Sequence, residues 1–223
     1  MNATMRLPDF FDRVPRLTVH DGLAETLGAA EGGILEYGYA DAVRLAGHSC
    51  PTVAGAYWLT LRALSALYPD TLPERGGVRV AFRGDVRQGV NGVVACVVQL
   101  LTGAADESGF KGLFGRHARS GLQHFAPDLP MALRFTRTDT GAAVDAEADL
   151  AMLPQDPELA ELLGRCAHRR CDDASLARLA VLWQRRVEHL LLDLAYDDGV
   201  FVIRPCAPAA GAARRLPESA SAQ

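Results

Sequence analysis

The residues best suited to chemistry are His48 and Cys50, in the segment Gly47-His48-Ser49-Cys50-Pro51. Pro51 favours the first position of a helix, which makes Cys50 the N-cap. Free backbone N–H groups and the positive end of the helix dipole stabilise a thiolate at such a position. Zinc and similar ions accept an imidazole and a thiolate together, and Gly47 and Pro51 allow the bend that this spacing requires. A structural interpretation also stands, in which His48 caps the helix and Cys50 fills a small apolar gap.

Two further groups of residues could bind a ligand. His117 lies with Arg116 and Arg119 in the glycine-rich segment 104–119, where two arginines would attract an anionic substrate or a haem propionate. A histidine in a loop can equally be only solvated. Cys166-Ala167-His168-Arg169-Arg170-Cys171 offers three metal-ligand types within six residues, with Cys206 as a possible fourth, although its spacing matches no zinc finger.

The elements that must position these residues are indicated by hydrophobic period and by breakers. The segment 51–67 is apolar nearly all round, which predicts a central helix that ends before Tyr68-Pro69. Segments 92–101, 158–166 and 175–196 are also expected to be helical, as are 21–30 and one turn at 41–45. Strands are expected at 34–39, 77–83 and 200–204, with a hairpin formed by 133–138 and 142–150 around Thr140-Gly141.

This order of elements predicts an α+β fold, because helices and strands do not alternate strictly. We expect a two-layer sandwich of a small mixed or antiparallel sheet with central apolar helices, plus a helical C-terminal extension. Residues 1–17 are expected to be an extended lead-in, since Pro8 and Pro15 break helices. One domain should then cover 18–206, and the Ala/Pro/Ser-rich stretch 207–223 is expected to be disordered.

Composition narrows the class of protein. A hydrophobic fraction of 49% and a charged fraction of 22% are typical of a globular domain. The net charge of −4, with both signs interspersed, argues against nucleic-acid binding. No apolar run is long enough to span a bilayer, and the N-terminus lacks the pattern of a secretory signal. Five cysteines without framework spacing favour reduced thiols, so we expect a cytoplasmic protein.

Two ordered blocks carry a family resemblance. The first is GHSCP before a helix rich in small residues, and the second is Gln99-Leu100-Leu101-Thr102-Gly103 with the loop Gly109-Phe110-Lys111-Gly112. Over roughly residues 30 to 125 they resemble the FmdE-like family, which is named after a component of formylmethanofuran dehydrogenase. The resemblance implies an α+β fold and binding of zinc or another transition metal by His48 and Cys50. Beyond the resemblance, Cys96 lies on the helix that should pack beside the first and could substitute as a third ligand.

The chain also departs from the family pattern. Val93 falls near a position where the family has cysteine, Cys96 falls where it has aspartate, and Ala104-Ala105 follow the Thr-Gly pair in place of Cys-Thr. The C-terminal zinc ribbon of many members is missing. A full ligand set therefore cannot be transferred, and Cys96 can equally be a small hydrophobic residue of the core.

We predict a metal-binding protein, with zinc as the first choice, that has an accessory or small-molecule-binding role and an open coordination position. One alternative is a haem-binding or gas-sensing module, with His48 or Cys50 as axial ligand and Arg116 and Arg119 at the propionates. Another is a redox protein that uses the Cys50 thiol. No pattern assigns a catalytic residue. Apolar residues along 175–196 are expected to pack mainly within the chain, and a homodimer remains the alternative.

Overall fold

The structure, a computed structural model, describes residues 6–206. The tail predicted at 207–223 lies outside the described residues. Among the described residues the chain forms helices together with one two-stranded and one five-stranded sheet, which confirms the α+β prediction. In chain order the elements are η1 (Asp9–Arg13), β1 (Leu17–His20), α1 (Gly22–Thr26), η2 (Glu31–Gly33), β2 (Ile34–Tyr37), α2 (Tyr39–Ala46), α3 (Pro51–Leu67), β3 (Val78–Arg83), α4 (Asn91–Thr102), β4 (Gln123–Ala126), β5 (Leu133–Arg137), β6 (Ala143–Ala148), η3 (Leu150–Met152), α5 (Pro157–Ala167), α6 (Asp173–Glu188), η4 (His189–Asp193) and β7 (Phe201–Pro205).

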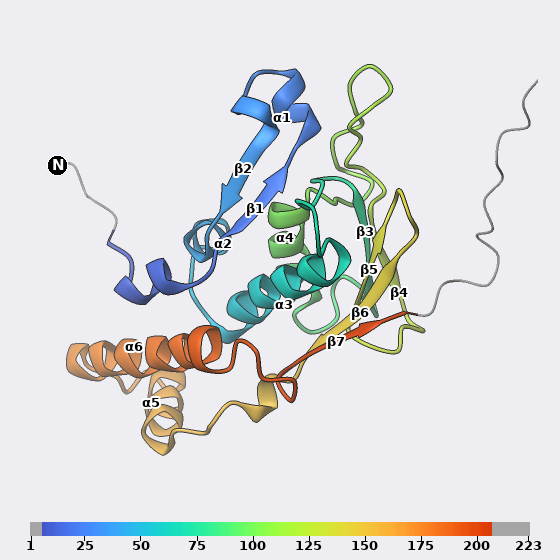
Figure 1. Ribbon diagram of the computed structural model, residues 1–223. Helices are drawn as coiled ribbons and strands as arrows, with labels where there is room; N and C mark the ends of the chain where they lie inside the picture. The colour runs from blue at the N-terminus through green and yellow to red at the C-terminus, as the bar shows by residue number, and fades with distance from the viewer. Residues whose placement is uncertain (1–5, 207–223) are drawn as a thin grey trace, which may run out of the picture.

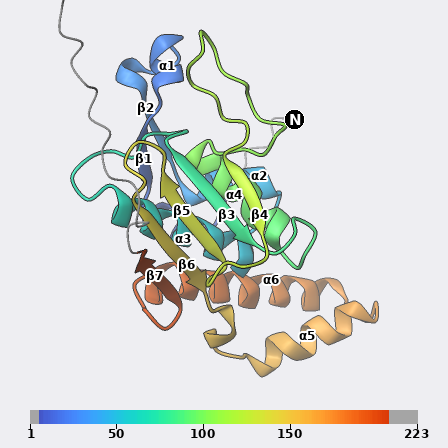
Figure 2. The same cartoon turned by 90° about the vertical axis from the view of Figure 1, so that its right-hand side faces the viewer.

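The larger sheet is mixed and has the strand order β4-β3-β5-β6-β7. Only β3 and β4 pair in parallel, and the other neighbours are antiparallel. Along β3 the side chains of Val78, Val80 and Phe82 are buried and alternate with more exposed residues, as the sequence period predicts. Helices α3 and α4 cover one face of this sheet, and Figure 2 shows its other face open toward the viewer.

Helix α3 lies at the centre of the molecule (Figure 1). It has the bounds that the sequence predicts, because Pro51 starts it and Tyr68-Pro69 ends it. Its side chains are buried on nearly all sides, between the sheet, α4, α2 and the end of the α6–η4 segment. The expected helix at 175–196 is α6 followed by the π-helical turn η4, and Leu182 and Leu190 of its apolar residues are buried within the chain.

Two expectations for the N-terminal region are corrected by the structure. The lead-in is not extended throughout, because the interval between Pro8 and Pro15 holds the short 3₁₀ helix η1, which buries Phe10 and Phe11. The helix expected over 21–30 ends at Thr26. Leu27, counted as part of its apolar face, is 62% exposed and has no core to face. The helical turn expected at 41–45 is the longer α2.

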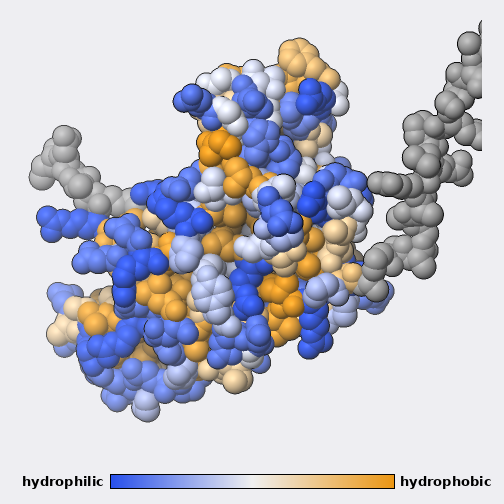
Figure 3. Space-filling model, in the orientation of Figure 1, coloured by the Kyte–Doolittle hydropathy of each residue, from blue (hydrophilic) through white to orange (hydrophobic). Residues whose placement is uncertain are grey.

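Strands β1 and β2 form a separate antiparallel hairpin with α1 and η2 at its tip. In Figure 1 the hairpin stands above the main body, while α5 and α6 lie on the opposite side. Figure 3 shows hydrophobic residues in the middle of this face, between mainly hydrophilic residues of the hairpin above and of the helices below. No helix among residues 6–206 is long and apolar enough to cross a membrane.

Candidate functional site

The segment Gly47–Pro51 is the turn between α2 and α3. Gly47 ends α2 in the left-handed conformation, with a φ of 74°, and its N–H donates to the carbonyl of Val43 at 2.8 Å. Cys50 is the N-cap of α3, and its Sγ accepts from the N–H of Val53 at 3.5 Å. The position predicted for Cys50 at the start of a helix is therefore confirmed. Backbone donors and the helix dipole favour a negative charge there.

Helix α6 holds the middle of this turn by hydrogen bonds to Ser49. The carbonyl of Ser49 accepts from Trp183 Nε1 at 2.8 Å and from Gln184 Nε2 at 3.5 Å, so α6 fixes the peptide between the two candidate ligands. The Ser49 hydroxyl lies 2.9 Å from that of Tyr39. Burial raises the pKa of Tyr39, and the bond to Ser49 opposes this rise. Because Tyr39 stays protonated, its hydroxyl can donate to Ser49 over the whole working pH range.

His48 and Cys50 differ in accessibility. His48 is exposed, and its Nδ1 lies 3.0 Å from the carbonyl oxygen of Ala46. A carbonyl can only accept, so Nδ1 carries the proton of the neutral ring and the lone pair is on Nε2. This is the arrangement in which proteins hold a metal-binding histidine. Cys50 is buried, with 9% of the residue exposed.

Cys96 does not join these two residues. Helix α4 packs against α3 and α2, as expected, but the Cys96 side chain is exposed on the face of α4 that also carries Val93. Within residues 6–206 no three His, Cys, Asp or Glu side chains are grouped so that they could hold a metal ion together. His48 and Cys50 share the turn before α3, two positions apart in the chain, and no third such side chain completes a group with them among residues 6–206.

A small apolar cavity lies beside the first turns of α3. It has a volume of about 130 Å³ and is lined by small residues of α3, including Gly55 and Ala56, and by Val94 of α4 and Phe82 of β3. The apolar helices 51–67 and 92–101 thus leave a narrow space between them. This space is smaller than the about 300 to 1,000 Å³ typical of pockets for small molecules.

Arg116, His117 and Arg119, the three candidate residues of the glycine-rich loop, differ in exposure and in partners. Arg116 is exposed, whereas Arg119 is 7% exposed and donates from Nη2 to Asp21 Oδ1 at 2.8 Å and from Nη1 to the carbonyl of Arg75. Arg75 Nη1 also donates to Asp21, at 3.0 Å. His117 lies against the hairpin tip, with its Nε2 3.5 Å from the hydroxyl of Thr26. Arg119 therefore forms part of an internal ion cluster, Asp21–Arg75–Arg119.

No sequence pattern indicates the Asp21–Arg75–Arg119 cluster, or the group that His20 forms with Glu74 and Glu25 at the hairpin tip. The Nδ1 of His20 lies 2.5 Å from Glu74 Oε2, and its Nε2 lies 3.2 Å from Glu25 Oε2. The bond to Glu74 raises the pKa of His20, against the effect of desolvation. Glu74 and Glu25 lie far apart along the chain, so only the folded chain shows that both flank one imidazole.

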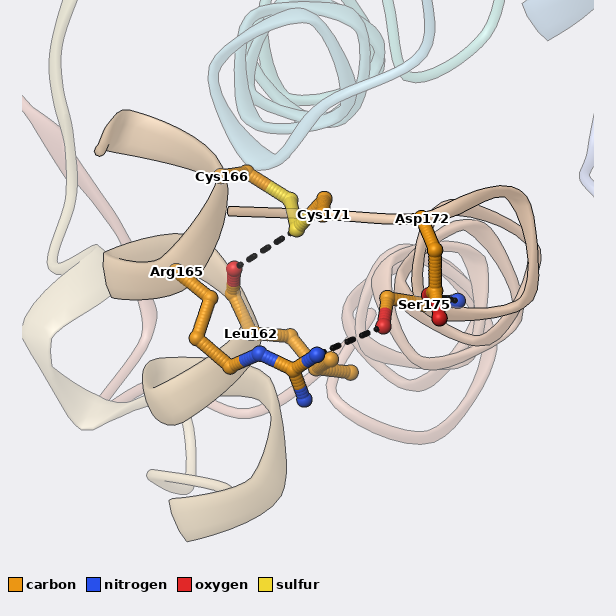
Figure 4. Close-up of a disulfide and its surroundings, with 6 residues drawn as sticks. All are labelled: Leu162, Arg165, Cys166, Cys171, Asp172 and Ser175. Atoms are coloured by element: carbon orange, nitrogen blue, oxygen red, sulfur yellow. Dashed lines mark hydrogen bonds between the residues drawn. A yellow bond between two sulfur atoms is a disulfide. The ribbon is translucent and has the colours of Figure 1, made fainter. Parts of the chain in front are cut away.

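Cys166 and Cys171, considered above as possible metal ligands, form a disulfide in the structure (Figure 4). His168 is the C-cap of α5. The expectation of reduced thiols is thus not met for this pair, whereas Cys50, Cys96 and Cys206 are free. Two disulfide-bonded sulfurs are not available as thiolate ligands. The bond closes the turn between α5 and α6, where Arg165 donates to Ser175 at 3.0 Å.

Replacing Cys166 and Cys171 together by serine is expected to lower the free energy of unfolding by about 2 kcal/mol, the loop-entropy value for so short a closed loop. Urea denaturation of the oxidised protein measures this difference. The exposed Cys96→Ser is the control and should change stability by less than about 0.5 kcal/mol. Reductant should lower the urea midpoint of the wild type to that of the double variant. Equal wild-type midpoints with and without reductant would show that the disulfide has no stabilising role.

A scan of the sequence against models of known protein families finds no match, and a search of curated proteins finds no similar sequence.

Proposed function

We propose that this protein binds one transition metal ion, zinc first, through His48 Nε2 and Cys50 Sγ, and that a small molecule or water completes the coordination. The observation that carries the proposal is the bond from His48 Nδ1 to the carbonyl of Ala46, because it directs the lone pair of Nε2 outward beside a helix N-cap cysteine. The resemblance of GHSCP and the Gln99–Gly103 block to the FmdE-like family supports the same two ligands.

The donor set suits zinc. One nitrogen and one sulfur ligand are both of types that zinc accepts, and a tetrahedral ion would keep two positions for exchangeable ligands. A site with open positions serves substrate binding or catalysis, whereas a structural site is closed by four protein ligands. The chain's own contribution is an imidazole whose Nδ1 is engaged, a cysteine sulfur at a helix N-cap and a turn held by Trp183. We further propose an accessory or small-molecule-binding role, and a cytoplasmic location on the ground of the three free cysteines Cys50, Cys96 and Cys206.

Zinc is expected to bind the metal-free protein at one site per chain, as measured by calorimetric titration. Loss of a residue that only hydrogen-bonds to a metal ligand typically weakens metal binding about 10- to 100-fold. His48→Ala and Cys50→Ser remove the ligands themselves, so each should weaken zinc binding by more than this. Cobalt titrated in place of zinc should produce a thiolate-to-metal absorption band in the wild type and none in Cys50→Ser, because the band requires the Cys50 sulfur.

Two controls accompany this titration. Cys96→Ser should leave the affinity unchanged, because Cys96 is exposed on another helix. Trp183→Phe should weaken binding less than the ligand variants, because it removes only the bond to the Ser49 carbonyl. Stoichiometric zinc that survives both ligand substitutions would refute the proposal. A Soret band in the purified protein would show that it binds haem, and would favour the haem alternative over zinc at this site.

A further inference from the structure

A second cavity, of about 400 Å³, lies where α6 passes into the π-helical turn η4. Its volume falls in the range of about 300 to 1,000 Å³ that is typical of small-molecule pockets. Leu182, which is 3% exposed, and Pro154 supply its apolar surface. Arg185, Arg186 and His189 line the same cavity. It therefore combines an apolar wall with a group of potential cations.

The acidic side chains that line this cavity are already engaged. Asp156 is the N-cap of α5 and accepts from the N–H groups of Glu158 and Leu159 at 2.9 and 3.2 Å. Glu188 pairs with Arg13 of η1, and Asp193 Oδ2 lies 2.7 Å from His189 Nδ1. The carboxylates thus satisfy other groups of the protein.

The two arginines are not engaged in this way. Neither Arg185 nor Arg186 makes a side-chain hydrogen bond or ion pair to another residue in the range 6–206, and the Nε of Arg186 is buried without a partner. A buried N–H without an acceptor costs free energy. A planar guanidinium pairs best with two oxygens of a carboxylate or phosphate, through Nε and one Nη. An oxyanion in this cavity would meet two guanidinium groups that have no acidic partner among residues 6–206.

Helical spacing brings these side chains to one cavity, because Arg185, Arg186 and His189 follow Leu182 by three, four and seven positions and so share one face of the α6–η4 segment. One extra residue per turn at His189–Asp193 changes the direction in which the following side chains project, and such turns are frequent at functional sites. The bond to Asp193 engages Nδ1 of His189, so the other ring nitrogen is left for a ligand. His189 thus adds a third polar group beside the two arginines.

We propose that this cavity binds a small organic anion, a carboxylate or phosphate whose oxygens pair with Arg186 and Arg185 and whose apolar body lies against Leu182 and Pro154. The site is separate from the proposed metal site, since none of residues 47–51 lines the cavity. Helix α6 connects the two sites, because its Trp183 donates to the Ser49 carbonyl. The test of anion binding does not depend on metal binding.

The test titrates the full-length protein with hexanoate, hexyl phosphate, inorganic phosphate and uncharged hexanol, and follows the Nε–Hε NMR signals of the arginines. Hexanoate or hexyl phosphate should shift the Arg186 signal with a dissociation constant of about 1 mM or below. The tighter of the two identifies the anionic group. Hexanol should bind more weakly by about tenfold or more, because it offers no charged oxygen.

Arg186→Gln and Arg185→Gln should each weaken binding of the preferred anion about tenfold or more. Arg178→Gln is the matched control on the same helix, because Arg178 is paired with Glu158, and it should leave binding unchanged. Arg186→Lys keeps the charge but loses the two-pronged geometry, so it should also bind more weakly. The wild-type signal of Arg186 remains a direct test if a variant does not fold.

Three results would overturn the proposal. The first is that no anion shifts the Arg186 signal at concentrations well above 1 mM. The second is that Arg178→Gln weakens binding as much as Arg186→Gln, which would indicate general charge attraction. The third is that inorganic phosphate binds as tightly as the hexyl anions, which would show that the apolar wall takes no part.

Discussion

Asp21→Asn is expected to lower the free energy of unfolding by about 3 to 5 kcal/mol, the typical cost of breaking a buried ion pair by removal of one partner. The Asp21 side chain is 5% exposed and that of Arg119 is 8% exposed. Asparagine retains the oxygen that caps α1, where Asp21 Oδ1 accepts from the N–H groups of Leu23 and Ala24. The loss therefore reports the uncompensated charge of Arg119. Urea denaturation at neutral pH measures it.

The dependence of the free energy of unfolding on pH in the acid range gives an independent check of the Asp21 contribution. Burial by itself raises the pKa of Asp21, but the Ala24 N–H, Arg75 and Arg119 together lower it below 3.8. Because the pKa is lower in the folded state, the stabilisation is present above pH 3.8 and is lost as the pH falls through the folded pKa. The difference between wild type and Asp21→Asn should therefore shrink in that range and be constant near neutrality.

Asp139→Asn is the matched control for this substitution. Asp139 pairs with Arg137 at the surface, and this pair lowers its pKa to about 2. An exposed pair contributes about 0 to 1 kcal/mol, so its loss should be small. A loss for Asp21→Asn no larger than that for Asp139→Asn would show that the buried pair contributes no more to stability than an exposed one.

Gly76→Ala is expected to have the second large effect, because two costs combine. Gly76 has a φ of 87°, in the region that L-residues avoid at a cost of about 1 to 2 kcal/mol. A Cβ at this position would also collide with Nη1 of the Arg119 guanidinium, which must shift and weaken its bonds to the Arg75 carbonyl and Asp21. The total should exceed the backbone cost and stay below the about 3 to 5 kcal/mol of breaking the buried pair outright. The same denaturation experiment measures it.

Gly141→Ala separates the two costs. Gly141 also has a positive φ, of 73°, but a Cβ there would have no atom within 4 Å. It should therefore show the backbone cost alone. In the Asp21→Asn background the additional cost of Gly76→Ala should disappear, since the pair that it disrupts is already broken. Additive losses in the double variant would contradict the proposed coupling through Arg119.

Much of the main body could be predicted from the sequence because its signals are local. The bounds of α3 follow from Pro51 and Pro69, and β3 follows from its alternating apolar residues. The same local pattern predicted the N-cap position of Cys50 and so the candidate pair with His48. These features depend on backbone preferences and on periodic burial, which neighbouring residues determine.

The other features were decided only by tertiary contacts. Strand β4 has no alternating pattern and forms by parallel pairing with β3, while η1 persists between two prolines because the core buries Phe10 and Phe11. Trp183 reaches the carbonyl of Ser49 across 134 positions, and Arg119 reaches Asp21 across 98. No local pattern marks such partners, because they are selected by packing. His48 and Cys50 were thus indicated by sequence, whereas the exposure of Cys96 and the burial of Arg119 depend on the folded chain.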